Sequence, residues 1–138
     1  MNIAIIGTGY VGLVTGTCFA EMGNDVICVD IDERKVEMLC RGELPIYEHD
    51  LDVYLHRNLR EERLVFTTEL AKAVKQSEVI FLALPTPPGE DGSADLSYVL
   101  GVAEDIARLL QADAEREHKI VVNKSTVPVG TADQVRAI

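Results

Sequence analysis

Residues 3–12 read Ile3-Ala4-Ile5-Ile6-Gly7-Thr8-Gly9-Tyr10-Val11-Gly12, an apolar run that passes directly into three closely spaced glycines. A short run rich in isoleucine is typical of a strand buried on both faces. The G-x-G-x-x-G spacing between such a strand and a helix is typical of a turn that holds a dinucleotide. The glycine pattern alone is a weak signal, so the rest of the chain must supply its context.

Each glycine of this turn has a separate predicted role. Gly7 permits the tight turn out of the strand, and Gly9, which lacks a Cβ, lets a pyrophosphate approach the backbone. Gly12 lets the next helix pack against the sheet, and Gly16 extends the same small-residue face by one turn. The amino end of that helix then offers free N–H groups and a positive dipole end to the phosphates.

A carboxylate follows at the expected distance. The second predicted strand ends at Asp30, 18 residues after Gly12. A carboxylate at this place accepts hydrogen bonds from the adenosine ribose and repels a 2′-phosphate, which favours NAD over NADP. Arg34 and Lys35 weaken this preference, because a nearby cation can neutralise a phosphate. A role for Asp30 in helix capping is the alternative interpretation.

Apolar runs and amphipathic segments alternate along the chain. We expect strands at Ile3–Ile6, Val26–Val29, Leu64–Phe66, Val79–Leu84 and Ile120–Val122. We expect helices at 10–22, 32–40, 50–59, 69–76 and 96–110, and one more that opens with a Thr131–Gln134 capping box. The alternation predicts an α/β fold of the Rossmann type: a doubly wound parallel sheet of strand order 3-2-1-4-5 with helices on both faces.

Composition narrows the class of protein. The 138 residues are 47% hydrophobic and 26% charged, which indicates one soluble globular domain. A net charge of −10 speaks against nucleic acid and anionic lipid as partners, and no apolar run approaches the roughly 18 residues of a membrane span. Cys18, Cys28 and Cys40 form no metal pattern, so we expect no metal site and three buried, reduced thiols in a cytoplasmic protein.

Two later loops should lie at the same edge of the sheet as the glycines, because ligands of such sheets bind at the carboxyl ends of the strands. The fourth strand runs into a proline-rich loop that contains Thr86, and the fifth into a loop that contains Lys124 and Thr126. Either threonine hydroxyl could contact the cofactor. The alternatives are that Thr86 bonds its own backbone, that Thr126 caps a turn and that Lys124 is a plain surface lysine.

In combination, these motifs resemble the UDP-glucose/GDP-mannose dehydrogenase family over essentially the whole chain. The residues that carry the resemblance are Gly7-Thr8-Gly9-Tyr10-Val11-Gly12-Leu13, Val29-Asp30-Ile31-Asp32, Leu44-Pro45-Ile46-Tyr47-Glu48, Pro85-Thr86-Pro87-Pro88 with Asp95-Leu96-Ser97, and Lys124-Ser125-Thr126-Val127-Pro128-Val129-Gly130-Thr131. One departure is visible after Glu48, where the family usually continues Pro-Gly-Leu and this chain has His49-Asp50-Leu51. The start of the following helix therefore departs from the family pattern.

The resemblance implies a bound NAD and a set of cofactor residues. That set is Gly7, Gly9, Tyr10, Val11, Gly12, Asp30, Lys35, Thr86 and Thr126. Val11 is expected to contact the pyrophosphate through its backbone, with Asp30 and Lys35 on the adenosine side. Thr86 and Thr126 are expected near the nicotinamide ribose, and Thr126 also resembles the family threonine that supports the catalytic water network.

The resemblance also implies an activity for the full-length protein. Family members oxidise the C6 alcohol of a nucleotide sugar to a carboxylate with two NAD, through a cysteine thioester. The nucleophilic cysteine is expected beyond residue 138, so we expect an amino-terminal fragment, residues 1–138, that binds NAD without turnover. The UDP-sugar should then bind only to the full-length protein, which is expected to be a homo-oligomer.

Several readings stay open at this point. The Leu44–Glu48 stretch favours the family members that oxidise UDP-glucose over those that oxidise GDP-mannose or UDP-N-acetylmannosamine. A stand-alone dinucleotide-binding module without chemistry is a different class of function. A β-hydroxyacid dehydrogenase shares the glycine fingerprint, but the Pro85–Pro88 and Lys124–Pro128 loops argue against it.

Overall fold

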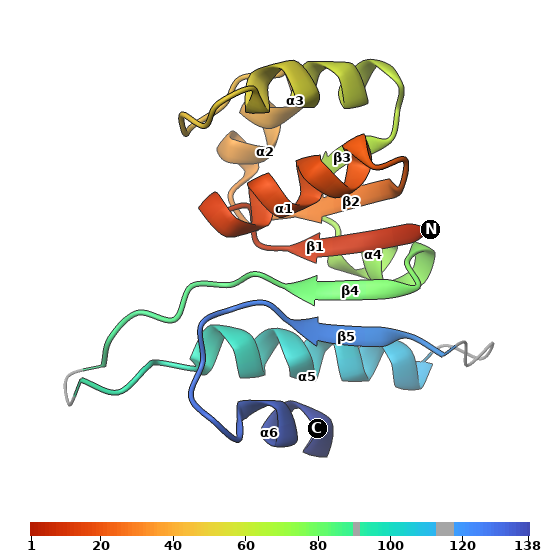
Figure 1. Ribbon diagram of the computed structural model, residues 1–138. Coiled ribbons are helices and arrows are strands. Elements are labelled where there is room, and N and C mark those ends of the chain that lie inside the picture. The colour runs from red at the N-terminus through yellow and green to blue at the C-terminus, as the bar shows by residue number, and fades with distance from the viewer. Residues whose placement is uncertain (90–91, 113–117) are drawn as a thin grey trace.

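Within the described residues, five parallel strands form one sheet in the order β3-β2-β1-β4-β5, and Figure 1 shows this sheet at the centre of the molecule. The computed structural model describes residues 1–89, 92–112 and 118–138. The strands are β1 (Asn2–Ile6), β2 (Asp25–Val29), β3 (Leu64–Thr67), β4 (Val79–Leu82) and β5 (Ile120–Asn123). The predicted fold class and strand order are both confirmed.

The central strand explains why the first apolar run has no polar positions. Ile3 and Ile5 contribute to one hydrophobic cluster, whereas Ala4 and Ile6 contribute to a second. All four side chains are buried. Because successive side chains of a strand point to opposite faces, a strand covered on both sides must be apolar at every position.

Helices cover both faces of the sheet (Figure 1), and the helices of the described segments divide between two hydrophobic clusters. The first cluster joins β1 to α1 (Tyr10–Glu21), α2 (Glu33–Cys40) and α3 (Leu51–Arg60). The second joins it to α4 (Leu70–Gln76), α5 (Ser97–Ala112) and α6 (Thr131–Ala137). The amphipathic stripe predicted for residues 96–110 is the buried face of α5, with Val99 and Ile106 almost fully covered.

Hydrogen bonds at Gly23 and at Asp32 confirm two predicted helix boundaries. Gly23 follows α1 with a φ of 91°, and its N–H donates to the Ala20 carbonyl at 2.9 Å. Only glycine adopts this left-handed conformation without steric cost. Asp32 precedes α2, and its carboxylate accepts the N–H groups of Arg34 at 3.0 Å and Lys35 at 3.2 Å.

The fourth strand is shorter than predicted. Its pairing with β5 ends at Leu82, and the next two apolar residues, Ala83 and Leu84, lie outside the strand. The Leu84 N–H donates to the side chain of Ser125 at 2.9 Å, so a side chain replaces the strand partner there. The apolar sequence pattern cannot show where the strand partner is replaced by a side chain, because Leu84 is apolar and half-buried.

The predicted capping box at the start of α6 is wrong. Gly130 is the residue that precedes the helix, with a φ of 92°, and Thr131 is its first helical residue. Because Thr131 lies inside the helix, its side chain makes no capping bond, and its hydroxyl donates backward to the Pro128 carbonyl at 2.8 Å.

The prediction of three buried thiols is also wrong. Cys28 is buried in β2, and burial raises the pKa of its thiol to about 12. Cys18, in α1, and Cys40, the last residue of α2, are exposed. All three are free cysteines. Across the described part of the chain, no helix has the length and apolar character that a membrane crossing requires.

Candidate cofactor site

The strands of the sheet end at one edge, on the left of Figure 1, and the glycine turn lies there between β1 and α1. Gly7 has a φ of +100°, and its N–H donates to the Val29 carbonyl at 2.8 Å. A Cβ on Gly7 would lie 2.5 Å from the carbonyl oxygen of Ala83. The turn therefore requires glycine for its conformation and for the close approach of the chain that follows β4.

The amino end of α1 is open on one side and tightly packed on the other. No heavy atom lies within 4 Å of the Cβ position of Gly9, which precedes the helix. A Cβ on Gly12 would lie 1.9 Å from the Gly7 carbonyl oxygen and 3.2 Å from the Ala83 Cβ. Gly12 thus holds the helix against the turn, while Gly9 leaves free space in front of its first N–H groups.

The next two helical residues face outward. Tyr10 is 53% exposed and Val11 is 47% exposed. The Tyr10 hydroxyl donates to the carboxylate of Glu48, in the segment between α2 and α3. This bond raises the pKa of the Tyr10 phenol and lowers the pKa of the Glu48 carboxyl.

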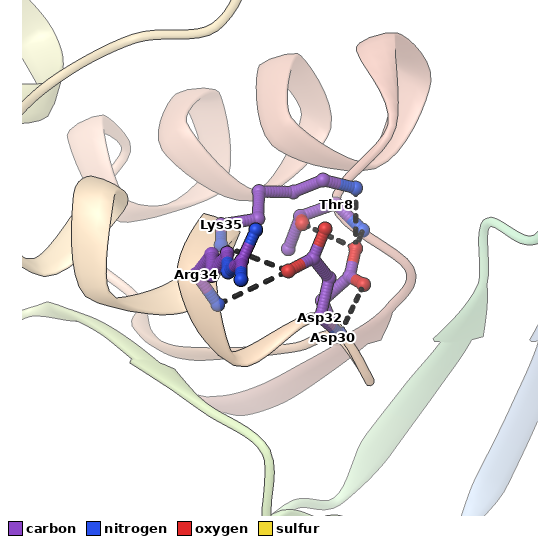
Figure 2. Close-up of polar contacts among 5 residues, drawn as sticks. All are labelled: Thr8, Asp30, Asp32, Arg34 and Lys35. Carbon is purple, nitrogen blue, oxygen red and sulfur yellow. Dashed lines mark hydrogen bonds and ion pairs between the residues drawn. The ribbon is translucent and has the colours of Figure 1, made fainter.

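Asp30 lies beside this turn and accepts four hydrogen bonds (Figure 2). Its Oδ2 receives the Thr8 N–H at 3.0 Å, the Thr8 hydroxyl at 2.5 Å and the Lys35 ammonium at 2.9 Å. Its Oδ1 receives the Asp32 N–H at 3.1 Å. Asp30 does not cap α2, because Asp32 makes both capping bonds.

These bonds keep Asp30 ionised. Partial burial pushes the pKa of its carboxyl upward, but the hydrogen bonds from Thr8 and Lys35, with those from the backbone, bring it down to about 2. The Asp30 side chain is 11% exposed and the Lys35 side chain 30%. In Figure 2, Lys35 reaches Asp30 from the first turn of α2, so the predicted adenosine-side pair is an ion pair in this structure.

The two later loops meet at the same edge. The Thr86 hydroxyl donates to the backbone carbonyl of Thr126 at 2.8 Å. Thr86 is half-buried and Thr126 is exposed. Thr86 therefore bonds the other loop and not its own backbone. Lys124 is exposed, and its backbone N–H donates to the Leu82 carbonyl at 2.9 Å.

Two side chains at this edge have no role in the sequence interpretation. Thr8 is 2% exposed and supplies two of the four donors to Asp30. The Ser125 hydroxyl accepts from the Leu84 N–H at 2.9 Å and lies 2.8 Å from the Leu84 carbonyl oxygen, so it holds the loop after β4 against the loop after β5. The signal that could have identified Thr8 is a polar residue between two glycines. For Ser125 the signal is a polar residue just after the end of a strand.

The departure from the family pattern at His49-Asp50 leaves the following helix in place. The helix begins at Leu51, with Asp50 before it at a φ of 60°. A glycine, which the family usually has at this position, adopts that conformation freely, whereas aspartate adopts it at some steric cost. Within the described residues, no group of three or more His, Cys, Asp or Glu side chains could hold a metal ion.

Comparison with known proteins agrees with this geometry. The NAD-binding domain model of the UDP-glucose/GDP-mannose dehydrogenase family matches residues 1–138. UDP-glucose 6-dehydrogenase of Pseudomonas aeruginosa is 55% identical over all of this chain, which covers 29% of that protein. UDP-glucose 6-dehydrogenase TuaD of Bacillus subtilis is 48% identical over 99% of the chain and 29% of its own length.

Solved structures show the same relation. A ternary complex of GDP-mannose dehydrogenase from Pseudomonas aeruginosa superimposes with a TM-score of 0.92 at 36% identity, over 98% of this chain and 30% of that one. A UDP-glucose dehydrogenase from Pyrobaculum islandicum gives a TM-score of 0.88 at 38% identity, over 98% of this chain and 32% of that one. The chain spans about three tenths of the length of these relatives. It belongs to the UDP-glucose/GDP-mannose dehydrogenase family and corresponds to the NAD-binding domain of that family.

Proposed function

We propose that these 138 residues bind NAD at the carboxyl edge of the sheet, as the cofactor domain of a UDP-glucose 6-dehydrogenase. The observation that carries the proposal is the placement of an ionised carboxylate, Asp30, beside a glycine cradle that is open at Gly9. A cofactor with both a diphosphate and a ribose diol needs these two features side by side.

The glycine cradle fits the diphosphate. Gly9 leaves space where a side chain would block the approach, and the helix after it begins with no side-chain cap and no acidic residue in its first turn. The N–H groups of this turn, including those of Tyr10 and Val11, are therefore available as donors to phosphate oxygens. Gly7 and Gly12 keep the turn in the required shape.

Asp30 fits the adenosine ribose. Its carboxylate is ionised over the whole physiological pH range, because its pKa lies at about 2. A ribose diol donates hydrogen bonds to such a group, whereas a 2′-phosphate is repelled by it, so NAD is the expected cofactor. Lys35 neutralises part of this charge, and the preference for NAD over NADP should therefore be moderate.

Thr86 and Thr126 belong to the nicotinamide side of the proposed site. Their loops are held together by the bond between the Thr86 hydroxyl and the Thr126 carbonyl. The exposed Thr126 hydroxyl is free to face the cofactor or a water molecule near the reacting carbon. We assign Thr126 a supporting role in catalysis and place no nucleophile in this chain.

The proposed reaction of the full-length enzyme converts the C6 alcohol of UDP-glucose to the carboxylate of UDP-glucuronate. The oxidation releases four electrons and consumes one water molecule, so two NAD accept one hydride each. A cysteine thioester is the proposed intermediate before hydrolysis. Cys28 is enclosed between β2 and α1, and the exposed Cys18 and Cys40 lie on helix surfaces, so none of them is placed for this step.

The substrate assignment is supported by relatives of known name. Identity reaches 55% with a UDP-glucose 6-dehydrogenase, compared with 36% for a GDP-mannose dehydrogenase of very similar structure. GDP-mannose therefore remains the second candidate, on the strength of the TM-score of 0.92. The proposal includes a cytoplasmic location and a homo-oligomeric full-length enzyme.

Calorimetric titration of the chain with NAD, and with NADP as the comparison, tests the proposed binding. Asp30→Ala should weaken NAD binding by about 10- to 100-fold, since a hydrogen bond to a charged group is worth roughly 1.5–3 kcal/mol. Asp25→Ala is the matched control, because Asp25 is an exposed aspartate at the opposite end of the same strand. No binding of NAD, or equal affinity in both variants, would refute the assignment of Asp30.

A second measurement separates binding from turnover. With UDP-glucose and NAD together, the chain should produce no NADH absorbance, because it lacks a placed nucleophile. Appearance of NADH would show that one of its own side chains performs the chemistry and would overturn this part of the proposal.

A further inference from the structure

Tyr10 and Glu48 connect two parts of the chain that meet at the proposed phosphate cradle. Tyr10 is the first residue of α1, and its hydroxyl donates to Oε2 of Glu48, 38 residues away. Glu48 lies in the segment between α2 and α3, which has no other side-chain hydrogen bond to α1 among the bonds found in the described residues.

The first two residues of α1, Tyr10 and Val11, have few other anchors. Gly9 before them provides no side-chain cap, and the first turn carries no acidic residue that would bond its N–H groups. Tyr10 and Val11 are about half exposed, so the core does not hold them. Gly12 is the first position at which the helix packs closely, against the carbonyl oxygen of Gly7. Between the anchored residues Thr8 and Gly12, the bond of the Tyr10 hydroxyl is therefore the side-chain contact that holds the start of the helix.

Glu48 is itself held firmly. Its Oε1 accepts the His49 N–H at 3.2 Å, so each carboxylate oxygen has a donor. Its backbone carbonyl accepts the Leu51 N–H at 3.2 Å, at the start of α3. Two residues earlier, Ile46 packs against the hydrophobic cluster beneath α1. A continuous chain of contacts thus runs from the core through Glu48 to Tyr10.

We infer that Glu48 is a positioning residue for the cofactor: through the Tyr10 hydroxyl it fixes the first turn of α1, whose N–H groups receive the diphosphate. The inference rests on the proposed NAD function and adds a residue that the glycine fingerprint does not contain. It assigns the phenol of Tyr10 a structural task at the rim of the cradle, separate from any backbone contact that Tyr10 makes.

A purely electrostatic role for Glu48 predicts the opposite sign. A carboxylate near a diphosphate repels it, so removal of the negative charge alone would tighten NAD binding. Positioning predicts that the loss of the hydrogen bond weakens binding, whereas loss of the charge with retention of an acceptor changes it little. Glu48→Gln keeps one oxygen acceptor for the Tyr10 hydroxyl, and Glu48→Ala keeps none.

A double-mutant cycle on NAD affinity is the first test. Tyr10→Phe and Glu48→Ala should each weaken NAD binding by roughly three- to tenfold, and the double variant should be no weaker than the worse single variant. Glu48→Gln should stay within about twofold of the parent. Tyr47→Phe is the control, because Tyr47 is the adjacent tyrosine and is 91% exposed. Additive effects, unchanged affinities, or tighter binding by Glu48→Gln would each overturn the inference.

A spectroscopic titration provides a readout that is independent of NAD binding, with circular dichroism of each variant to show that it stays folded. The chain has four tyrosines and no tryptophan, so tyrosinate absorbance reports the phenols alone. Glu48→Gln should lower the pKa of one phenol toward its ordinary value, and Tyr10→Phe should remove that phenol from the titration curve. An unchanged curve in Glu48→Gln would show that the contact is absent in solution and would overturn the inference. If the parent chain fails to bind NAD at all, the proposed function fails, whatever the tyrosines show.

Discussion

Two helical glycines should respond to alanine with opposite signs. A Cβ at Gly12 would lie 1.9 Å from the carbonyl oxygen of Gly7, so the backbone of the turn or the whole of α1 must move by more than 1 Å. Overpacking of this kind costs about 1–3 kcal/mol, and the contact with backbone places Gly12→Ala at the upper end. At Gly101 in α5, no heavy atom lies within 4 Å of the Cβ position. Gly101→Ala should therefore gain about 1 kcal/mol from helix propensity.

Urea unfolding followed by circular dichroism measures both variants under one condition. Propensity offsets part of the overpacking at Gly12, which leaves a loss of about 2 kcal/mol and a gap of about 3 kcal/mol between the variants. The m-values should not change, since the surface exposed on unfolding is the same. NAD affinity should fall in Gly12→Ala and remain unchanged in Gly101→Ala. Shifts of the two midpoints in the same direction would refute the packing argument at Gly12.

Four further substitutions test single contacts and backbone conformations. The folded pKa of Asp30 is about 2, below its ordinary value of 3.8, so the contribution of its ionised carboxylate to stability is complete above about pH 4 and is lost as the pH falls toward 2. Asp30→Asn should remove about 1 kcal/mol of that acid dependence, after a reduction for solvent screening. Urea midpoints at several pH values would show this change. Asp50→Gly and Glu62→Gly should each raise the free energy of unfolding by about 1 kcal/mol, because both residues have a positive φ, of 60° and 57°; a loss of stability in both would contradict this. Ser125→Ala should lower it by about 1–2 kcal/mol, because the Leu84 N–H loses its acceptor, and an unchanged midpoint would mean that water replaces the serine.

The parts of the fold that sequence predicts are those set by local chemistry. Ile3–Ile6 reads as a doubly covered strand because every position is apolar, and the structure buries all four side chains. Gly7 and Gly23 are both found at positive φ, where the turn and the helix stop required them. The capping of α2 by Asp32 can be predicted, because the capping bonds join residues only two and three positions apart. Interactions between residues this close in the chain can be predicted from the sequence pattern itself.

The missed features depend on contacts between distant segments. The Thr8 hydroxyl meets Asp30 across 22 residues, and Ser125 meets Leu84 across 41. No periodicity connects such pairs, and threonine or serine in a turn is equally compatible with a bond to its own backbone. The wrong capping box has a different, local origin: the helix begins one residue earlier than the capping box requires, after Gly130, and the Thr131 hydroxyl donates to the Pro128 carbonyl three residues before it.

The positions of the cysteines bear on how the proposed chemistry is divided. A Cβ on Gly16 would lie 2.6 Å from the Cys28 sulfur, which shows that this thiol faces α1 and not the glycine cradle. The Cys40 sulfur lies 3.6 Å from the Phe66 carbonyl oxygen, and Cys18 is exposed on α1. Every residue assigned to the cofactor lies instead at the carboxyl edge. If the proposed function is correct, variants of this edge should change cofactor affinity without changing thiol reactivity, and blocking the two exposed thiols, Cys18 and Cys40, should leave NAD binding intact. Cofactor binding and covalent catalysis are then separable tasks, and only the first is built into these residues.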